Sequence, residues 1–224
     1  MDRISTMDMV LLFELATFWF IIFFVTNLIM IKHFPMPPRI AAKANPQLRK
    51  VIFVNFISNL PSFIHAVIAF VSGLYIFAYH GVRLAGPNLF VEGLLLSFSL
   101  GYFLNDTILS WIYGHNTTPM MLHHYQVVFV AIYVLAKDEY GSIAVWTLVI
   151  AEASNPFNIL RVTFEKYKGC ESAATITGIA FAVVFIYCRS PNKDVSTFCN
   201  HFAFAGKYSF AFYQDLRRRD VLSE

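Results

Sequence analysis

The sequence predicts an all-α polytopic transmembrane helical bundle, which is a chain of hydrophobic helices that crosses a bilayer several times. Of its 224 residues, 57% are apolar and 14% are charged, whereas soluble domains carry roughly 25% charged residues. The apolar residues come in long runs separated by short charged loops, and about 20 apolar residues in a helix suffice to cross a bilayer. These runs occupy the whole chain, so we expect residues 1–224 to form a single transmembrane domain.

Six apolar runs predict six spans, and a further segment is a candidate for a seventh. The six runs cover residues 9–31, 51–78, 90–113, 121–136, 142–160 and 173–187. The fourth and sixth are short for a hydrocarbon core of roughly 30 Å, but a locally thinner bilayer accommodates them. The seventh segment, residues 195–214, is rich in Phe and Tyr but also holds Asn200, His201 and Lys207. It fits either a polar span shielded by its neighbours or an amphipathic helix at the interface.

The distribution of Lys and Arg favours seven spans. Seven spans place 11 of these residues on one side of the membrane and 5 on the other, leaving out Lys207, whereas six spans give 8 on each side. Because loops rich in Lys and Arg stay on the inner side, we expect the N-terminus to lie outside. The same topology accounts for the net charge of +3, so no nucleic-acid partner is expected. Cys188 and Cys199 would share the outer end, where either a disulfide or two reduced cysteines fit the sequence.

Ionisable residues inside the predicted spans define the candidate site, because such residues are costly in lipid and usually mark a cavity or a function. At 1.5 Å per residue, Asp106 lies about 10 Å from the inner end of the third span, and His123 and His124 lie about 7–9 Å deep in the fourth. The short connection makes these helices antiparallel neighbours, so we expect Asp106 to pair with a histidine and to fix its tautomer. Glu152 lies near the middle of the fifth span, with Arg161 nearer its inner end.

Several of these residues also have a structural interpretation. Adjacent helical residues point about 100° apart, so at most one of His123 and His124 can face a cavity, and a purely structural clasp fits the pair as well. His65 is alone on an apolar helix, which is typical of an interior histidine. Glu14 and Glu92 fall near the outer ends of their spans, where we expect them to extend to the membrane surface.

Two prolines within spans favour a cavity. Pro61 and Pro156 each displace the carbonyl four residues earlier, on Ile57 and Glu152, and leave an acceptor free. With the asparagines nearby, the two interruptions predict a lined cavity open toward the inside. No metal site is expected, because the histidines lack the repeated spacing of histidine-box enzymes.

Three sequence stretches resemble the TLC domain family, which contains the TRAM translocon proteins, the Lag ceramide synthases and several smaller lipid-related membrane proteins. The stretches are GYFLND at 101–106, MLHHYQVVFVAIYV at 121–134 and AEASNPFNILR at 151–161. The resemblance covers about residues 51–213, and His65 is similar to the family's second-span histidine. Ceramide synthases carry an H-D-x-x-D element after their histidine pair. This chain has Glu152, Asn155 and Pro156 instead, which is similar to the smaller branch concerned with membrane lipid composition, transport or trafficking.

The resemblance implies a lipid-sized cavity and leaves three hypotheses for its function. The first is lipid binding in membrane lipid homeostasis, without a cofactor. The second is an accessory subunit that binds other membrane subunits and keeps the fold without catalysis. The third is an acyltransferase that uses acyl-CoA, in which His123 or His124 is the general base and Asp106 orients it. The residues expected at the cavity are His65, Asn105, Asp106, His123, His124, Glu152, Asn155 and Arg161.

The membrane itself is indicated by the resemblance alone. The family resemblance implies the endoplasmic reticulum, and the mitochondrial inner membrane is the alternative. Membrane lipids are the expected partners in either case.

Overall fold

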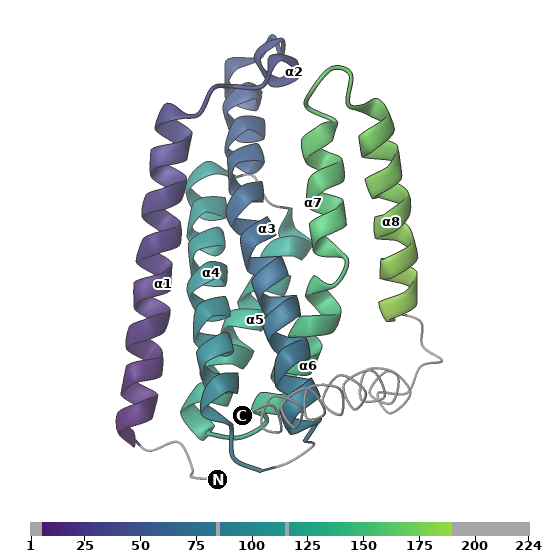
Figure 1. The fold of residues 1–224 in the computed structure, drawn as a ribbon. Coiled ribbons are helices and arrows are strands. Elements are labelled where there is room, and N and C mark those ends of the chain that lie inside the picture. Colours follow the sequence, from purple (N-terminus) through teal and green to yellow (C-terminus); the bar gives the residue numbers. More distant parts are fainter. Residues whose placement is uncertain (1–5, 84–85, 115–116, 190–224) are drawn as a thin grey trace, which may run out of the picture.

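The computed structural model describes residues 6–83, 86–114 and 117–189, and these form a bundle of helices that run up and down along one direction (Figure 1). Within these ranges there is no strand, only one isolated bridge between Pro87 and Glu139. The predicted all-α class is therefore confirmed. The helices are α1 (Thr6–His33), α2 (Pro38–Ala41), α3 (Pro46–His80), α4 (Phe90–Tyr113), α5 (Thr118–Lys137), α6 (Gly141–Glu152), α7 (Asn155–Phe164) and α8 (Glu171–Arg189).

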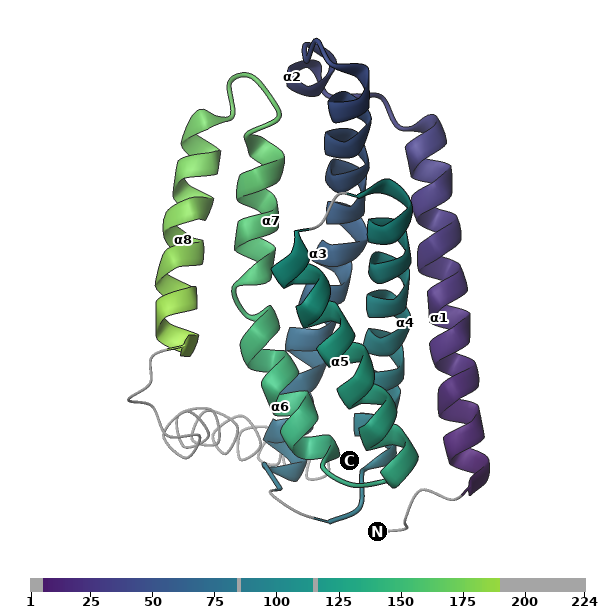
Figure 2. The ribbon, with the colours of Figure 1, turned by 180° about the vertical axis from the view of Figure 1, so that it is seen from behind.

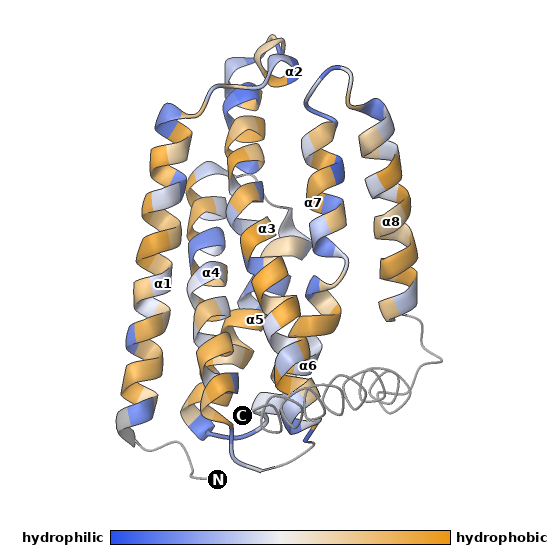
Figure 3. Cartoon of the chain, in the orientation of Figure 1, coloured by the Kyte–Doolittle hydropathy of each residue, from blue (hydrophilic) through white to orange (hydrophobic). Residues whose placement is uncertain are grey.

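Five segments are long and apolar enough to cross a membrane: Asp8–His33, Pro46–His80, Thr118–Lys137, Gly141–Phe164 and Glu171–Cys188. Their large apolar side chains lie exposed on the bundle surface, for example on α1 and α8, and Figure 3 shows this apolar covering along both helices. Apolar side chains on the outside are what a lipid environment requires. The chain is therefore an integral membrane protein.

The predicted third span, α4, is not among those five segments although it has 24 residues. It packs against α1, α3, α5 and α6, and most of its side chains are buried, including Ser97, Asn105 and Asp106. Because α4 faces other helices more than lipid, it tolerates polar residues that lower its hydropathy. The candidate span at 195–214 and the possible partner of Cys188, Cys199, lie outside the described residues.

The connections α1–α3 and α7–α8 lie at one end of the bundle, at the top of Figure 1, and α4 ends toward the same side. This end carries Lys32, Lys43, Lys50 and Lys168, whereas the described loops of the opposite end carry Arg83 and Lys137. The α2 end is thus the one that the positive-inside rule assigns to the inner side, and we call it the inner end.

The two prolines act differently. The helix that ends at Glu152 starts again only at Asn155, as Pro156 predicts, because proline cannot donate to the carbonyl of Glu152. By contrast, α3 runs without interruption through Pro61, so the prediction of a second interrupted helix was wrong. Pro61 is buried, and in a membrane bundle packing against neighbouring helices maintains a helix despite such a lost hydrogen bond.

Two glycines allow helices to approach α3 and α4 closely. A Cβ atom on Gly101 would lie 2.7 Å from the carbonyl oxygen of Ala16, so the backbones of α1 and α4 are in direct contact. A Cβ on Gly73 would lie 2.2 Å from a methyl group of Val149, which brings α3 against α6. Small residues at such crossings are typical of membrane helices, where packing drives association.

An ion pair between Glu92 and Arg83 closes the outer end, and it corrects the expected position of Glu92. Glu92 is fully buried, and its Oε2 accepts hydrogen bonds from Arg83 Nη2 at 2.7 Å and from the Leu89 amide at 2.8 Å. The prediction that Glu92 extends to the membrane surface was wrong, because Arg83 brings a counter-charge to it inside the bundle. Glu14, by contrast, is exposed on α1.

Candidate functional site

The predicted contact between Asp106 and a histidine is present, and the histidine is His124. Helices α4 and α5 are antiparallel neighbours (Figure 2), with His124 Nδ1 3.2 Å from Asp106 Oδ2. Both side chains are buried. The two groups thus lie within ion-pair distance of each other.

His65 lies at the centre of the bundle and links three helices. Its ring stacks on Tyr102 with centroids 4.1 Å apart and an interplanar angle of 12°, and Phe103 meets it edge-on. Its Nε2 lies 3.1 Å from Ser99 Oγ on α4, and its Nδ1 lies 4.0 Å from Glu152 Oε1 on α6. This geometry fits the interior histidine that the sequence indicates.

Tyr102 is held in place beneath His65 by a short chain of hydroxyl groups. Ser62 Oγ donates to the Ser58 carbonyl at 2.7 Å and lies 2.7 Å from the Tyr102 hydroxyl. A serine hydroxyl has one proton to donate, so the Tyr102 O–H must donate to Ser62 Oγ. The orientation of the Tyr102 ring, and with it the stacking on His65, is thereby fixed from α3.

Glu152 sits where α6 ends. Its Oε2 accepts a hydrogen bond of 2.9 Å from Asn155 Nδ2, at the start of α7. The carboxylate therefore lies beside the first turn of a helix, where free backbone N–H groups favour negative charge. The break that Pro156 causes thus places an acid inside the bundle with a partner.

A cavity of about 470 Å³ lies between α4, α5 and α6. Most of its polar lining residues gather toward the inner half, beside Phe103 and Ala151, and the outer half is mostly apolar but includes Thr147 and Tyr140. The polar group comprises Ser99, His123, Gln126 and Glu152. The apolar group comprises Leu96, Val127, Val130, Ala131, Val134, Ile143, Ala144 and Leu148. No Lys or Arg is among the described residues that line it.

The cavity opens sideways. Val130 on α5 and Ile143 on α6 both line it and are both exposed, so its mouth lies between these two helices. Its lining stops at His123 and Glu152, short of the α4–α5 connection. This cavity is therefore not the predicted one open toward the inside; the asparagines near Pro61 line a separate cavity at the inner end.

Of the predicted site residues, His123 and Glu152 line the cavity. The Asp106–His124 pair lies behind His123, while His65 and Asn155 reach the cavity only through their contacts with Ser99 and Glu152. The functional roles of all these residues stay predictions.

Two predicted residues lie elsewhere. Arg161 donates to Glu165 Oε1 at 2.6 Å and to Asn158 Oδ1 at 3.0 Å, and its side chain lies against Gly178 of α8. Asn105 is buried in α4 and does not line the cavity. Both side chains point away because rotation of a helix about its axis decides which face a residue presents.

Ser99, Tyr102 and Phe103 were not among the predicted site residues, although Tyr102 and Phe103 belong to the stretch 101–106 that resembles the TLC family. Together with Asp106 they recur at the spacing i, i+3, i+4 and i+7, which places them on one face of α4. That periodicity, counted for polar and aromatic residues, was the signal for the site. Among the described residues, no group of three or more His, Cys, Asp or Glu side chains is placed to hold a metal ion.

The order of these residues along the chain matches a known family. The model of the TLC domain matches residues 55–213. This chain belongs to the TLC domain family. The match begins in α3 and includes every residue of the cavity, whereas α1 precedes it. The resemblance of the three sequence stretches to the TLC domain is thereby confirmed. Neither the curated proteins nor the solved structures include a significant match to the chain.

Proposed function

We propose that this TLC-domain protein binds a lipid in the cavity between α4, α5 and α6 and acts in membrane lipid homeostasis. The observation that supports this is a mostly apolar cavity lining in which His123, Gln126 and Glu152 gather at the inner end. An acyl chain would lie along the apolar part, and the headgroup would meet His123, Gln126 and Glu152.

The size of the cavity supports an acyl chain. From His123 to Val134, both of which line it, α5 rises about 16 Å at 1.5 Å per residue. The sideways mouth between α5 and α6 faces the position of membrane lipids, so a chain could enter without leaving the hydrocarbon.

Selectivity would come from the polar end. An acyl chain in a bilayer is already surrounded by hydrocarbon, so little is gained by moving it next to Val and Leu side chains. His123, Gln126 and Ser99 offer both donors and acceptors, and Glu152 offers an acceptor. A phosphate group would find no cation there. The lining therefore favours a headgroup that donates hydrogen bonds, such as a hydroxyl or an amide.

Two matched variants on α5 test this proposal. Val130 and Ile132 are two residues apart and equally exposed at 41%, but only Val130 lines the cavity. The full chain is purified in mild detergent, and its bound lipid is quantified by native mass spectrometry. We expect Val130→Trp to lose most of its bound lipid and Ile132→Trp to retain it. Equal lipid occupancy in both variants would refute the proposal.

The exposure of His123 to the cavity favours acyl transfer as a second candidate, because its imidazole can reach a bound headgroup and take a proton from a hydroxyl or an amine. The protein in vesicles, with acyl-CoA and an acceptor lipid, would then form an acylated product that His123→Ala abolishes. If the wild type forms no product, the enzyme candidate falls and lipid binding is unaffected. The accessory-subunit hypothesis stays a prediction, which the mass of the native complex tests.

A further inference from the structure

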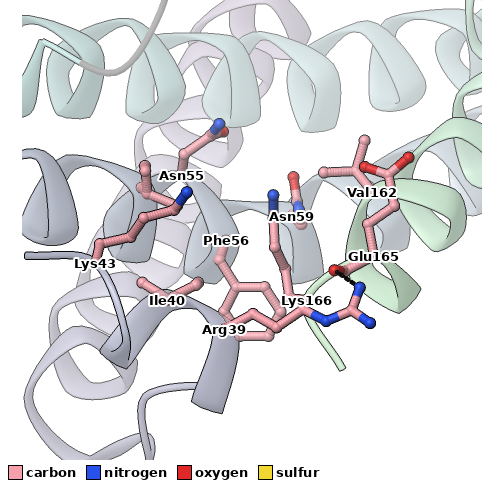
Figure 4. A pocket seen from close by; sticks show the side chains of 10 residues that line it. Arg39, Ile40, Lys43, Asn55, Phe56, Asn59, Val162, Glu165 and Lys166 are labelled. Carbon is pink, nitrogen blue, oxygen red and sulfur yellow. Dashed lines mark hydrogen bonds between the residues drawn. The ribbon is translucent and has the colours of Figure 1, made fainter. Parts of the chain in front are cut away.

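A second, cationic cavity lies at the inner end, away from the proposed acyl site. It has a volume of about 330 Å³ between α2, α3 and α7. Three cations line it, Arg39, Lys43 and Lys166, together with Asn55 and Asn59 of α3. In Figure 4 the amino groups of Lys43 and Lys166 extend toward the face of α3 that carries the two asparagines.

The charge of this cavity is not neutralised from within. Its one carboxylate, Glu165, accepts from Arg161, and Arg39 pairs with Glu171. Lys43 and Lys166 have no carboxylate partner in the part of the chain that the structure describes. The cavity thus presents two amino groups to any anion that enters it.

The amide of Asn59 adds a neutral donor to the same place. Its Nδ2 atom is buried and makes no hydrogen bond to any described residue, and the residue lines the cavity. A buried donor without an acceptor is unfavourable, so a ligand oxygen at this position would satisfy it.

The segment that carries Arg39 and Lys43 is held in position by packing and by a hydrogen bond. Ile40 of α2 is buried against Phe53, Phe56 and Ile57 of α3, which fixes the segment that carries Arg39 and Lys43. The Arg39 guanidinium also donates to the backbone carbonyl of Glu165 at 2.9 Å, so α2 is tied to α7 across the cavity. The cations therefore belong to a formed site between helices.

An apolar cavity adjoins it on the membrane side. This apolar cavity has a volume of about 320 Å³ and shares Phe56 and Asn59 with the cationic cavity. It continues along α3 to Leu60 and Phe63. Met30 of α1 and Leu160 of α7 also line it. Phe34 and Tyr167 of its lining lie at the inner-end connections, and Leu60 and Phe63 lie about one helical turn deeper. The apolar space therefore lies beside the charged one and extends farther into the membrane.

We propose that these two cavities together bind an anionic phospholipid of the inner-side leaflet. The phosphate lies between Lys43 and Lys166, one of its oxygens accepts from Asn59, and an acyl chain occupies the apolar cavity. Basic residues at this depth attract anionic lipids electrostatically, and the apolar cavity selects a lipid over a free anion. The proposal is independent of the acyl site, which no described cation lines.

The test measures lipid binding to the full chain, delipidated in detergent, by native mass spectrometry. Phosphatidic acid and phosphatidylcholine with identical acyl chains are the two probes, and we expect preferential binding of phosphatidic acid. Lys43→Gln and Lys166→Gln are each expected to weaken phosphatidic acid binding about fivefold, and the double variant about 25-fold. Lys168→Gln is the control, because Lys168 is exposed in the neighbouring connection and does not line the cavity.

Further variants and a competition measurement identify the ligand and exclude misfolding. Lys43→Arg keeps the charge and should retain binding, and Leu60→Trp should fill the apolar cavity and weaken it. Unchanged binding in the double glutamine variant, or an equal loss in Lys168→Gln, would overturn the proposal. Full competition by inorganic phosphate would also overturn it and would indicate a site for a free anion. Val130→Trp should leave the binding of phosphatidic acid unchanged. Failure of this proposal can therefore be distinguished from failure of the proposed acyl site.

Discussion

Glu92 and Glu14 are acids near the outer ends of predicted spans, and they offer a matched test of buried charge. Glu92 Oε2 accepts two hydrogen bonds inside the bundle, from Arg83 and from the Leu89 amide, whereas Glu14 is exposed. Hydrogen bonds to charged groups contribute about 1.5–3 kcal/mol each, but burying a carboxylate offsets part of this gain. We therefore expect Glu92→Leu to lower the free energy of unfolding by about 3 kcal/mol. Glu14→Leu should change it by less than about 0.5 kcal/mol.

The assay is reversible unfolding of the full chain in mixed micelles, in which helicity is followed by circular dichroism as the denaturing detergent increases. A double-mutant cycle with Arg83→Met isolates the ion pair, and we expect a coupling energy of about 2 kcal/mol. The Arg83 side chain is 27% exposed and can partly rehydrate, which keeps this value moderate. If the free energies of unfolding of Glu92→Leu and Glu14→Leu differ by less than about 0.5 kcal/mol, the buried pair does not stabilise the outer end.

Two further predictions concern the packing around the site. Gly73→Ala would bring a Cβ to 2.2 Å from Val149, so it should lower the free energy of unfolding by about 1–3 kcal/mol. Gly178→Ala would bring a Cβ only to 3.0 Å from Arg161 Cδ, which needs a much smaller shift, so this variant should unfold at nearly the wild-type detergent concentration; equal losses would contradict this reasoning. For the buried Asp106–His124 pair, a double-mutant cycle with Asp106→Leu and His124→Leu should give a coupling energy of about 1–3 kcal/mol by the same unfolding assay. Additive effects would show that the 3.2 Å contact contributes nothing.

The sequence alone determined the local features of this protein. Hydrocarbon requires every backbone polar group to be paired within its own helix, so long apolar runs predict helices and their approximate bounds. The helical rise then predicts depth, which placed Asp106 and the two histidines at one level, and a single proline predicts the break between Glu152 and Asn155. These properties depend on residues close together in the chain, which is why a sequence reveals them.

Only the tertiary structure decided which faces of the helices meet. Rotation about the helix axes chose His124 to pair with Asp106, left His123 to line the cavity and turned Arg161 toward α8. The burial of Glu92 depended on an arginine from the neighbouring loop. The mouth between α5 and α6 and the cationic cavity between α2, α3 and α7 depend on how these helices pack against one another. These features depend on which helix faces and loops pack against one another, and hydropathy does not encode that.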